Sequence, residues 1–289
     1  MKKRQYSIYL APAIILTLVF YIFPLLYLCY VSLFQWDGLG PMKFVSTQNF
    51  QKVLADRVFQ SAFKNTLIWI LSALFLHIPL GIVLALMLSR KPKGWKLMRI
   101  MYFVPNVIST TAIAFLWYFI FHVDVGLINN VLKAVGLGNL AHPWLNSLDT
   151  ALISSQIPFI LYVGLTMVIF LTQLSTIPES LYEAAEVDGA NGLKRDFYIS
   201  LPLMKPAIAT NILLNTAFCL RNFEYPFLMT GGGPANKTTN LSLYIYRQMI
   251  NANKYGVSMA AGVITVIMGF CIMYSVSLIG KERKGKTYD

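Results

Sequence analysis

Charged residues are scarce in this chain. Asp, Glu, Lys and Arg make up 12% of its 289 residues, about half the share in a soluble globular domain, whereas 56% are hydrophobic and the mean hydropathy is +0.59. The three cysteines and three histidines show neither paired nor metal-ligand spacing, and no G-x-S-x-G or H-E-x-x-H motif occurs. These scarcities argue against a soluble protein and against a metal or redox centre, and they favour a protein of the lipid bilayer.

Long apolar runs are abundant instead. A hydrocarbon core of about 30 Å takes about 20 helical residues to cross, and six runs are long enough. They lie at 9–33, 64–88, 100–121, 151–173, 204–228 and 257–279. The first follows a basic N-terminus but continues past Pro24 without a small-residue cleavage site, so it is interpreted as a retained span. The sequence predicts an all-α membrane protein, one domain over 1–289, with six transmembrane helices.

Basic residues mark one side of the membrane. Fifteen of the 24 Lys and Arg residues lie at one end of the six runs, which the positive-inside rule assigns to the cytoplasm. Both termini and the loop 174–203 are therefore expected in the cytoplasm, and the segments about 34–63, 122–150 and 229–256 outside it. The net charge of +12 thus indicates orientation rather than nucleic-acid binding.

Proline and polar residues interrupt the third and fourth runs. Pro105 and Asn106 open the third, and Pro158 and Tyr162 lie in the fourth. Irregular backbone at membrane depth is tolerated where neighbouring groups or a watery cavity satisfy it. These residues are expected to form either stable kinks and helix-packing contacts or the wall of a cavity.

Arg221 and Glu224 are three positions apart in the fifth run. On a helix, this spacing would put both charges on nearly one face, where they could pair. Ionisable residues inside a span usually face the bundle interior or a water-filled path. We expect either a structural ion pair or a contact with a ligand. His77, alone in an apolar run, is expected to be a packed, neutral imidazole.

Five of the twelve acidic residues fall within 179–196. Thr176 and Ser180 each precede a glutamate by three positions, the spacing of a capping box, which predicts a helix start. Gly189 and Gly192 predict a turn after it. Such a short helix is marginal alone in water, and a cytoplasmic membrane loop is ordinarily basic. The segment is expected to be either a protein-binding element or a solvated face.

The segment 175–206 resembles the EAA loop of permease subunits of bacterial ABC importers. That family's pattern is met by Glu183-Ala184-Ala185, Asp188-Gly189-Ala190, Ile199, Leu201-Pro202 and Pro206, with Asp196 at a position where the family commonly has phenylalanine. The resemblance extends to 44–67, to 102–109 and to 227–249. The last of these is similar to the GGP segment of the maltose-type first permease.

The resemblance implies the type I ABC importer permease fold, with a cytoplasmic coupling helix lodged in a groove of the ATPase. The implied coupling residues are Glu183, Ala184, Ala185, Asp188, Gly189 and Ala190. The implied substrate pathway contains Tyr102, Asn106, Leu161, Tyr162, Leu165, Cys219 and Asn222, to which Arg221 and Glu224 add charge. A ring can cover the apolar face of a pyranose while amides pair with its hydroxyls.

The expected function is that of the first of two permeases in an ATP-driven carbohydrate importer of the bacterial cytoplasmic membrane. The implied partners are a second homologous permease, two cytoplasmic ATPase subunits, an extracytoplasmic solute-binding protein, a sugar and membrane lipid, with no nucleic acid and no cofactor. The chain itself is not expected to be an enzyme. An oligosaccharide is the first expectation for the cargo, ahead of glycerol phosphate or an acidic sugar.

Two other classes of function stay open on the residues alone. An ion-coupled secondary transporter would need paired broken helices and a buried acid, for which Glu224 is the candidate. A membrane-embedded enzyme would need convergent nucleophile, acid and base groups. The spans supply only scattered ionisable residues, which disfavours the enzyme.

Overall fold

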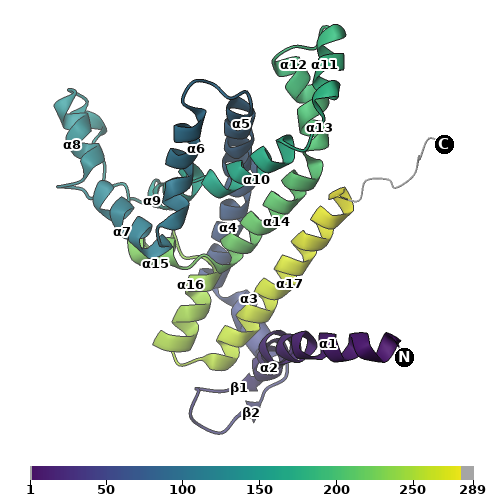
Figure 1. Ribbon diagram of the computed structural model, residues 1–289. Coiled ribbons are helices and arrows are strands. Elements are labelled where there is room, and N and C mark those ends of the chain that lie inside the picture. Colours follow the sequence, from purple (N-terminus) through teal and green to yellow (C-terminus); the bar gives the residue numbers. More distant parts are fainter. Residues whose placement is uncertain (1, 281–289) are drawn as a thin grey trace. The chain divides into compact units, whose positions relative to one another are not determined.

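The computed structural model describes residues 2–280, which are almost entirely helical (Figure 1). Within those residues, the β structure is one antiparallel hairpin of β1 (Phe34–Gln35) and β2 (Lys43–Phe44). The chain forms two compact units, each assembled from segments that lie far apart in the sequence. Unit 1 contains Met1–Gln60 and Leu241–Met268, and unit 2 contains Ser61–Asn240 and Gly269–Asp289.

Unit 1 begins with a long apolar stretch that its own chain leaves uncovered. The helices of this unit are α1 (Lys2–Thr17), α2 (Phe23–Ser32), α3 (Gln48–Ala55), α16 (Leu241–Tyr246) and most of α17 (Tyr255–Gly280), with π-helical turns at Leu18–Ile22 and Arg247–Asn251. The stretch Tyr9–Ser32 is only 6% buried. A helix that is apolar all round needs an apolar environment, which lipid or a partner helix can supply.

Hydrogen bonds attach the hairpin to the rest of unit 1. Asn49, on α3, is buried, and its amide donates to the carbonyl oxygens of Ser32 at 2.9 Å and Phe34 at 2.8 Å. The backbone amide of Tyr255 donates to the Trp36 carbonyl at 3.0 Å. These bonds satisfy backbone groups of the hairpin. They hold it against α3 and the start of α17.

Unit 2 consists of apolar helices that are interrupted at several points. Its helices are α4 (Arg57–Ser72, entering from unit 1), α5 (Ile78–Ser89), α6 (Trp95–Phe103), α7 (Thr110–Ile120), α8 (Leu127–Ala134), α9 (Ala151–Leu161), α10 (Gly164–Leu174), α11 (Glu179–Val187), α12 (Leu193–Arg195), α13 (Leu201–Leu203), α14 (Lys205–Arg221), α15 (Glu224–Thr230) and the part of α17 from Gly269 on. Turns of 3-10 helix occupy Val104–Val107 and Gly138–Leu140, and π-helical turns occupy Ala73–His77 and Asp196–Ser200.

Among the described residues, four helical stretches are long and apolar enough to cross a membrane: Tyr9–Ser32, Arg57–Ser89, Ala151–Leu174 and Tyr255–Val276. Two bent pairs meet the same standard, Trp95–Val107 with Thr110–Ile120 at a bend of 100° and Leu193–Leu203 with Lys205–Arg221 at 68°. Counting each pair as one span gives the predicted six. The prediction of an all-helical membrane protein is confirmed.

The third predicted run, 100–121, changes direction in the middle. α6 ends at Phe103, a 3-10 turn follows, and α7 starts at Thr110. Pro105 lacks the amide hydrogen that would continue the helix. Ser109 caps α7 by accepting a hydrogen bond from the Ala112 amide at 3.2 Å. The kink expected from the sequence is therefore a sharp bend.

The fifth predicted run, 204–228, is broken near its end. α14 stops at Arg221, Asn222 is extended with ψ 111°, and α15 begins at Glu224. The prediction that Arg221 and Glu224 share one helix face is therefore wrong, and no ion pair joins them in the part of the chain that the structure describes. The interruption removes the i, i+3 geometry that such a pair requires.

Two glycines allow helices of unit 2 to cross closely. A Cβ atom on Gly164 would overlap the Tyr102 carbonyl oxygen and the Phe103 Cα, and a Cβ on Gly81 would lie 2.5 Å from the Thr166 Cγ2. These two atoms facing Gly164 belong to the backbone, so side-chain rotation could not relieve the overlap with them. The close packing of α10 against α6 therefore requires glycine at 164, and its close packing against α5 requires glycine at 81.

A buried ion pair ties the segment after α11 to the end of α5. The guanidinium of Arg90, which follows α5, donates to the carboxylate of Asp196, whose side chain is 5% exposed. Arg195 approaches the other oxygen of this carboxylate at 3.9 Å. A buried carboxylate needs compensating charge. Arg90 supplies it, which accounts for an aspartate at the position where phenylalanine was the expected residue.

Replacing Gly164 by alanine should destabilise the protein. The added methyl group would overlap backbone atoms of α6, and overpacking of this kind costs about 1–3 kcal/mol. We expect a lower thermal unfolding midpoint for the detergent-solubilised protein. Gly138→Ala is the control, because the nearest atom to its new Cβ would be 3.6 Å away. An unchanged midpoint for Gly164→Ala would contradict the close crossing.

Replacing Arg90 by methionine should also destabilise the protein. Asp196 would stay buried without its main partner, and because Arg90 is itself 44% exposed we expect a loss of about 1–3 kcal/mol. The double variant Arg90→Met/Asp196→Leu removes both charges and should recover most of that loss. Thermal unfolding of both variants measures the effect, and an equal loss in the two would argue against the ion pair as the anchor.

Candidate substrate cavity and coupling loop

The acidic segment forms a short helix where the sequence predicted one, but without the predicted capping boxes. α11 begins at Glu179, and Pro178 occupies the N-cap position, where it provides no side-chain acceptor. The Thr176 hydroxyl donates to the Gln173 carbonyl at 2.8 Å and is turned to the preceding helix instead. Both capping-box assignments are therefore wrong, because the Thr176 hydroxyl bonds to the end of α10 and Ser180 already lies inside α11 rather than at its N-cap.

α11 ends in a turn that requires glycine. Gly189 and Gly192 have φ of +76° and +58°. The amide of Ala190 donates to the Ala185 carbonyl at 2.8 Å, and that of Gly189 donates to the Glu186 carbonyl at 3.1 Å. These bonds satisfy the last carbonyls of the helix, as in a Schellman motif. The predicted turn is present.

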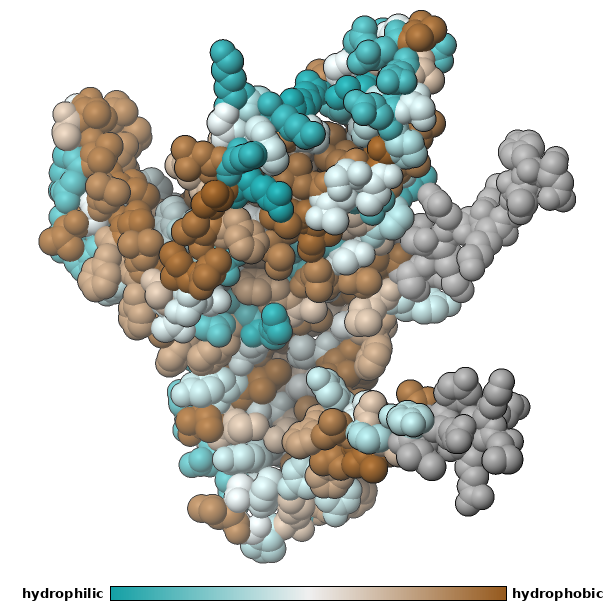
Figure 2. Space-filling view, viewed as in Figure 1, coloured by the Kyte–Doolittle hydropathy of each residue, from teal (hydrophilic) through white to brown (hydrophobic). Residues whose placement is uncertain are grey.

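The outer face of α11 is both apolar and acidic. Leu181, Val187 and, after the turn, Leu193 are 41%, 89% and 72% exposed. In Figure 2, hydrophilic side chains gather over α11–α13 with an apolar patch among them. Of the predicted coupling residues, Glu183, Ala184, Asp188 and Gly189 are exposed, Ala190 is half-buried and Ala185 is buried. Exposed apolar groups on a short helix indicate an interaction surface.

Arg195 makes the segment from α11 to α13 one folded element. Its guanidinium carbon lies 4.8 Å from the centroid of the Tyr182 ring, and its Nη1 lies 3.9 Å from the Glu186 Oε1. The Tyr182 hydroxyl is 3.4 Å from the Ser200 Oγ. Cation–π and charge contacts therefore connect α11 to the residues that lead into α14. We call the segment 179–203 the coupling loop.

A cavity of about 240 Å³ lies inside unit 2, where three helix interruptions meet. Asn106 lines it from the 3-10 turn after α6, Tyr162 from the break between α9 and α10, and Arg221 from the end of α14. Non-helical backbone at membrane depth is tolerated where it is buried in protein or lines a water-filled cavity. The interruptions therefore identify this cavity as the candidate substrate site.

Stacked rings form part of the cavity wall. The centroid of the Phe159 ring lies 4.6 Å from that of His77 and 5.0 Å from that of Phe218, with interplanar angles of 7° in both pairs. His77 is buried, and its ring nitrogens lie 2.8 Å from the Phe159 carbonyl oxygen and 3.0 Å from the Thr166 Oγ1. His77 is thus a packed ring with both nitrogens hydrogen-bonded.

Two amides on α14 face the cavity and were missed from the sequence. Asn215 donates from its Nδ2 to the Thr166 Oγ1 at 3.3 Å and to the Asn211 carbonyl at 2.9 Å. The Oδ1 of Asn211 is buried without a hydrogen-bond partner. The signal was present in the letters NILLN, since two amides one turn apart in an apolar run indicate a functional polar site.

The structure brings only some of the predicted pathway residues together. Asn106, Tyr162, Leu165 and Arg221 line the cavity, whereas Tyr102, Leu161, Cys219, Asn222 and Glu224 do not. Successive residues of a helix are rotated by about 100°, so neighbours in sequence face different directions. Tyr102 and Leu161 are 41% and 47% exposed, and Cys219 is fully buried.

Asn222 is the most unusual of these residues. It is 1% exposed, and neither its Nδ2 nor its Oδ1 has a hydrogen-bond partner among the residues that the structure describes. Its backbone carbonyl accepts from the Asn240 Nδ2 at 2.5 Å, which holds the extended residue in place. An unpaired buried amide costs about 1–3 kcal/mol. A native protein that retains such a group commonly uses it.

Comparison with known proteins gives one consistent result. The family model for the binding-protein-dependent transport system inner membrane component matches residues 77–284. The probable ABC transporter permease protein YurN of Bacillus subtilis is 31% identical over 286 residues, 96% of each chain. The sulfoquinovosyl glycerol transport system permease protein SmoG of Agrobacterium fabrum is 33% identical over 273 residues, 91% of this chain and 86% of SmoG.

A solved structure extends the similarity to three dimensions. One chain of a bacterial alginate ABC transporter, in complex with a periplasmic protein bound to an alginate pentasaccharide, is similar with a TM-score of 0.83 and 26% sequence identity. The similarity covers 96% of this chain and 95% of that one. The type I permease fold expected from the sequence is therefore confirmed. The chain belongs to the family of binding-protein-dependent transport system inner membrane components.

Proposed function

We propose that the chain is one of two permease subunits of an ATP-driven importer that translocates a sugar delivered by an extracytoplasmic binding protein. The observation that carries the proposal is the coupling loop, a folded element with an exposed apolar and acidic helix anchored to α5 by Arg90 and Asp196. Such a surface suits a cytoplasmic ATPase. The sugar cargo is supported by SmoG and by the alginate transporter.

ATP hydrolysis is assigned to separate subunits. The letters GKERKGKT at 280–287 match the phosphate-binding pattern G-x-x-x-x-G-K-[ST], and all but the first lie outside the described residues. A phosphate-binding loop follows a strand and opens a helix. Here an apolar helix of 26 residues, α17, precedes the pattern. The strand that would precede a phosphate-binding loop is therefore replaced here by a helix, which argues against a nucleotide site.

The coupling loop offers a mechanical route from the ATPase to the cavity. α14 starts at Lys205, directly after the loop, and carries Asn211, Asn215 and Arg221 along its length. A displacement of α11 would reach α14 through α12 and α13, while Arg90 holds the same loop to α5. ATP binding and hydrolysis would thus favour one arrangement of the cavity over another, which is the condition for alternating access.

The cavity suits a sugar, and an oligosaccharide is the first choice of cargo. Its stacked rings can cover the apolar face of a pyranose, and its amides can pair with hydroxyl groups that would otherwise be left unsatisfied. An acidic sugar is the second choice. Arg221 favours it, because this exposed guanidinium lines the cavity and forms no ion pair within the described residues.

The chain is proposed to lie in the bacterial cytoplasmic membrane with both termini in the cytoplasm. The basic residues near the coupling loop, such as Arg90, Arg99 and Arg195, support this orientation through the positive-inside rule. The uncovered stretch Tyr9–Ser32 is proposed to face lipid or a second, homologous permease.

Replacing Glu183 by lysine should uncouple ATP hydrolysis from uptake. The reversed charge lies on the exposed face of α11, so the ATPase should dock less tightly while the permease still folds. We expect uptake into proteoliposomes to fall by about tenfold or more, which corresponds to about 1.4 kcal/mol. Asp149→Lys, an exposed acid of a predicted exported segment, is the control. Normal coupling in Glu183→Lys would remove the ATPase-docking role.

Replacing Asn222 by leucine separates a structural role from a transport role. Removing an unpaired buried amide should leave thermal stability unchanged or raise it by about 1 kcal/mol. If the amide meets a sugar hydroxyl in another state of the transporter, the KM for uptake should rise or its maximal rate should fall by about tenfold. Asn130→Leu, at an exposed position of α8, is the control. Unchanged kinetics in Asn222→Leu would take this residue out of the pathway.

A further inference from the structure

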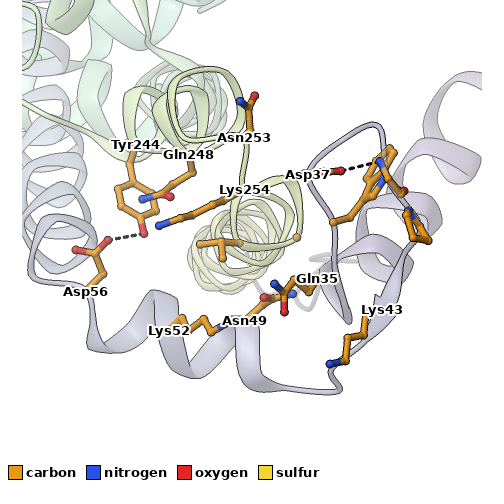
Figure 3. Close-up of a pocket in the computed structure, with 15 residues that line it drawn as sticks. Gln35, Asp37, Lys43, Asn49, Lys52, Asp56, Tyr244, Gln248, Asn253 and Lys254 are labelled. Carbon is orange, nitrogen blue, oxygen red and sulfur yellow. Dashed lines mark hydrogen bonds between the residues drawn. The ribbon is translucent and has the colours of Figure 1, made fainter.

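A second hollow, of about 530 Å³, lies within unit 1 and was not anticipated from the sequence (Figure 3). It is enclosed by the β1–β2 hairpin, by α3 and by the residues that connect α16 to α17. Figure 3 shows polar side chains from all three elements around it. Its volume is within the range of about 300–1,000 Å³ for ligand sites. We call it the hairpin cleft.

The two carboxylates of the hairpin cleft are engaged by the fold itself. Asp37 accepts from the amides of Leu39 at 3.0 Å and Gly40 at 2.8 Å. These backbone hydrogen bonds, that of Gly40 first, lower the pKa of Asp37 from its ordinary value. Asp56 accepts from the amide of Val58 and from the hydroxyl of Tyr244, both at 2.8 Å. The carboxylates therefore serve local structure.

The lysines of the hairpin cleft are not neutralised by these acids. Lys43, Lys52 and Lys254 all line it, and all are exposed. Within the described residues, none of the three forms an ion pair. The two carboxylates keep their negative charges although neutral groups donate hydrogen bonds to them, so the three ammonium groups leave the cleft with a net positive charge. A field of this sign attracts and orients an acidic partner.

The hairpin cleft is built rather than incidental. Gly256, on its floor, has no room for a side chain, because a Cβ would overlap the Phe34 carbonyl oxygen and lie 2.8 Å from the Asn49 Nδ2. The side-chain amide of Asn49 in turn donates a hydrogen bond to the Phe34 carbonyl of the hairpin. The Oε1 of Gln248, another lining residue, is buried without a hydrogen-bond partner.

The aromatic residues of the cleft are already packed against the chain. The Trp36 ring lies 5.2 Å from the Tyr255 ring, and its indole N–H donates to the Gly40 carbonyl at 3.0 Å. The Tyr244 ring lies 5.4 Å from that of Phe59, and its hydroxyl is bound by Asp56. Recognition here thus rests on ammonium groups rather than on a free ring, which favours a peptide carboxylate over a pyranose.

We propose that the hairpin cleft is a docking site for an acidic segment of the extracytoplasmic binding protein, whose Asp or Glu carboxylates pair with Lys43, Lys52 and Lys254. The inference rests on the proposed function and orientation, which put the hairpin and the α16–α17 connection outside the membrane. Lysines at the rim of such an interface accelerate association and make it sensitive to salt. The site adds electrostatic capture of the binding protein to the transport role.

The test uses the complete transporter in nanodiscs and the binding protein that supports its uptake. In Lys43→Glu/Lys52→Glu/Lys254→Glu, we expect the dissociation constant for the binding protein to rise at least roughly tenfold at low salt, with a weaker salt dependence. The maximal uptake rate at saturating binding protein should stay near that of the unaltered transporter. Lys64→Glu/Lys133→Glu/Lys237→Glu is the control, because it makes the same charge change at exposed lysines outside the cleft.

Four outcomes would overturn the inference. If the cleft variant and the control lose affinity equally, the effect is one of net charge. If only the cleft variant loses direct binding of an oligogalacturonate or of anionic lipid, with its affinity for the binding protein intact, the cleft takes a free acidic sugar or a headgroup instead. If the unaltered transporter shows no stimulation by the binding protein, the proposed function fails as well, whereas normal stimulation with an unchanged dissociation constant defeats the docking site alone.

Discussion

Backbone hydrogen bonding in a medium without water is the constraint on which this structure depends. Every N–H and C=O group at membrane depth has to be satisfied, which favours continuous helices and makes each interruption costly. The chain nevertheless interrupts helices beside Asn106, at Tyr162 and at Asn222. Asn106, Tyr162 and Arg221, the residue before Asn222, all line one cavity in unit 2. The lost backbone hydrogen bonds are thus concentrated around the cavity, where a polar cargo would need polar groups.

The coupling loop is held together by side-chain contacts. α11 has nine residues and would be marginal by itself in water. Arg195, Tyr182 and Glu186 bind its parts together, and the pair of Arg90 with Asp196 attaches the loop to α5. Because the loop is firm but its outer face stays exposed, a partner that grips this face could displace α14 and alter the cavity. Firm internal contacts and a free surface are both needed for that role.

Unit 1 combines uncovered apolar helices with a polar cleft. Its first helices leave their apolar side chains uncovered, as suits lipid or a partner subunit, while its hairpin and the α16–α17 connection form a polar cleft. The acids of that cleft are used by the fold, and its lysines are not. Charge left over after local structure is satisfied is available for a partner. The uncovered apolar helices and the polar cleft of this unit thus differ in the chemistry of the partner that they fit.

The sequence by itself determined the class of this protein and the position of its coupling loop. Six apolar runs, the distribution of lysine and arginine, and the letters EAA and DGA are local properties, so they can be recognised without a fold. The tertiary structure decided what depends on distance between segments. Asp196 became meaningful only beside Arg90, 106 positions away, and Asn211 and Asn215 only beside Thr166 and the broken helices. Of the two alternatives left open for Arg221 and Glu224, the structural ion pair is excluded within the described residues, because the single extended residue Asn222 ends the helix between them.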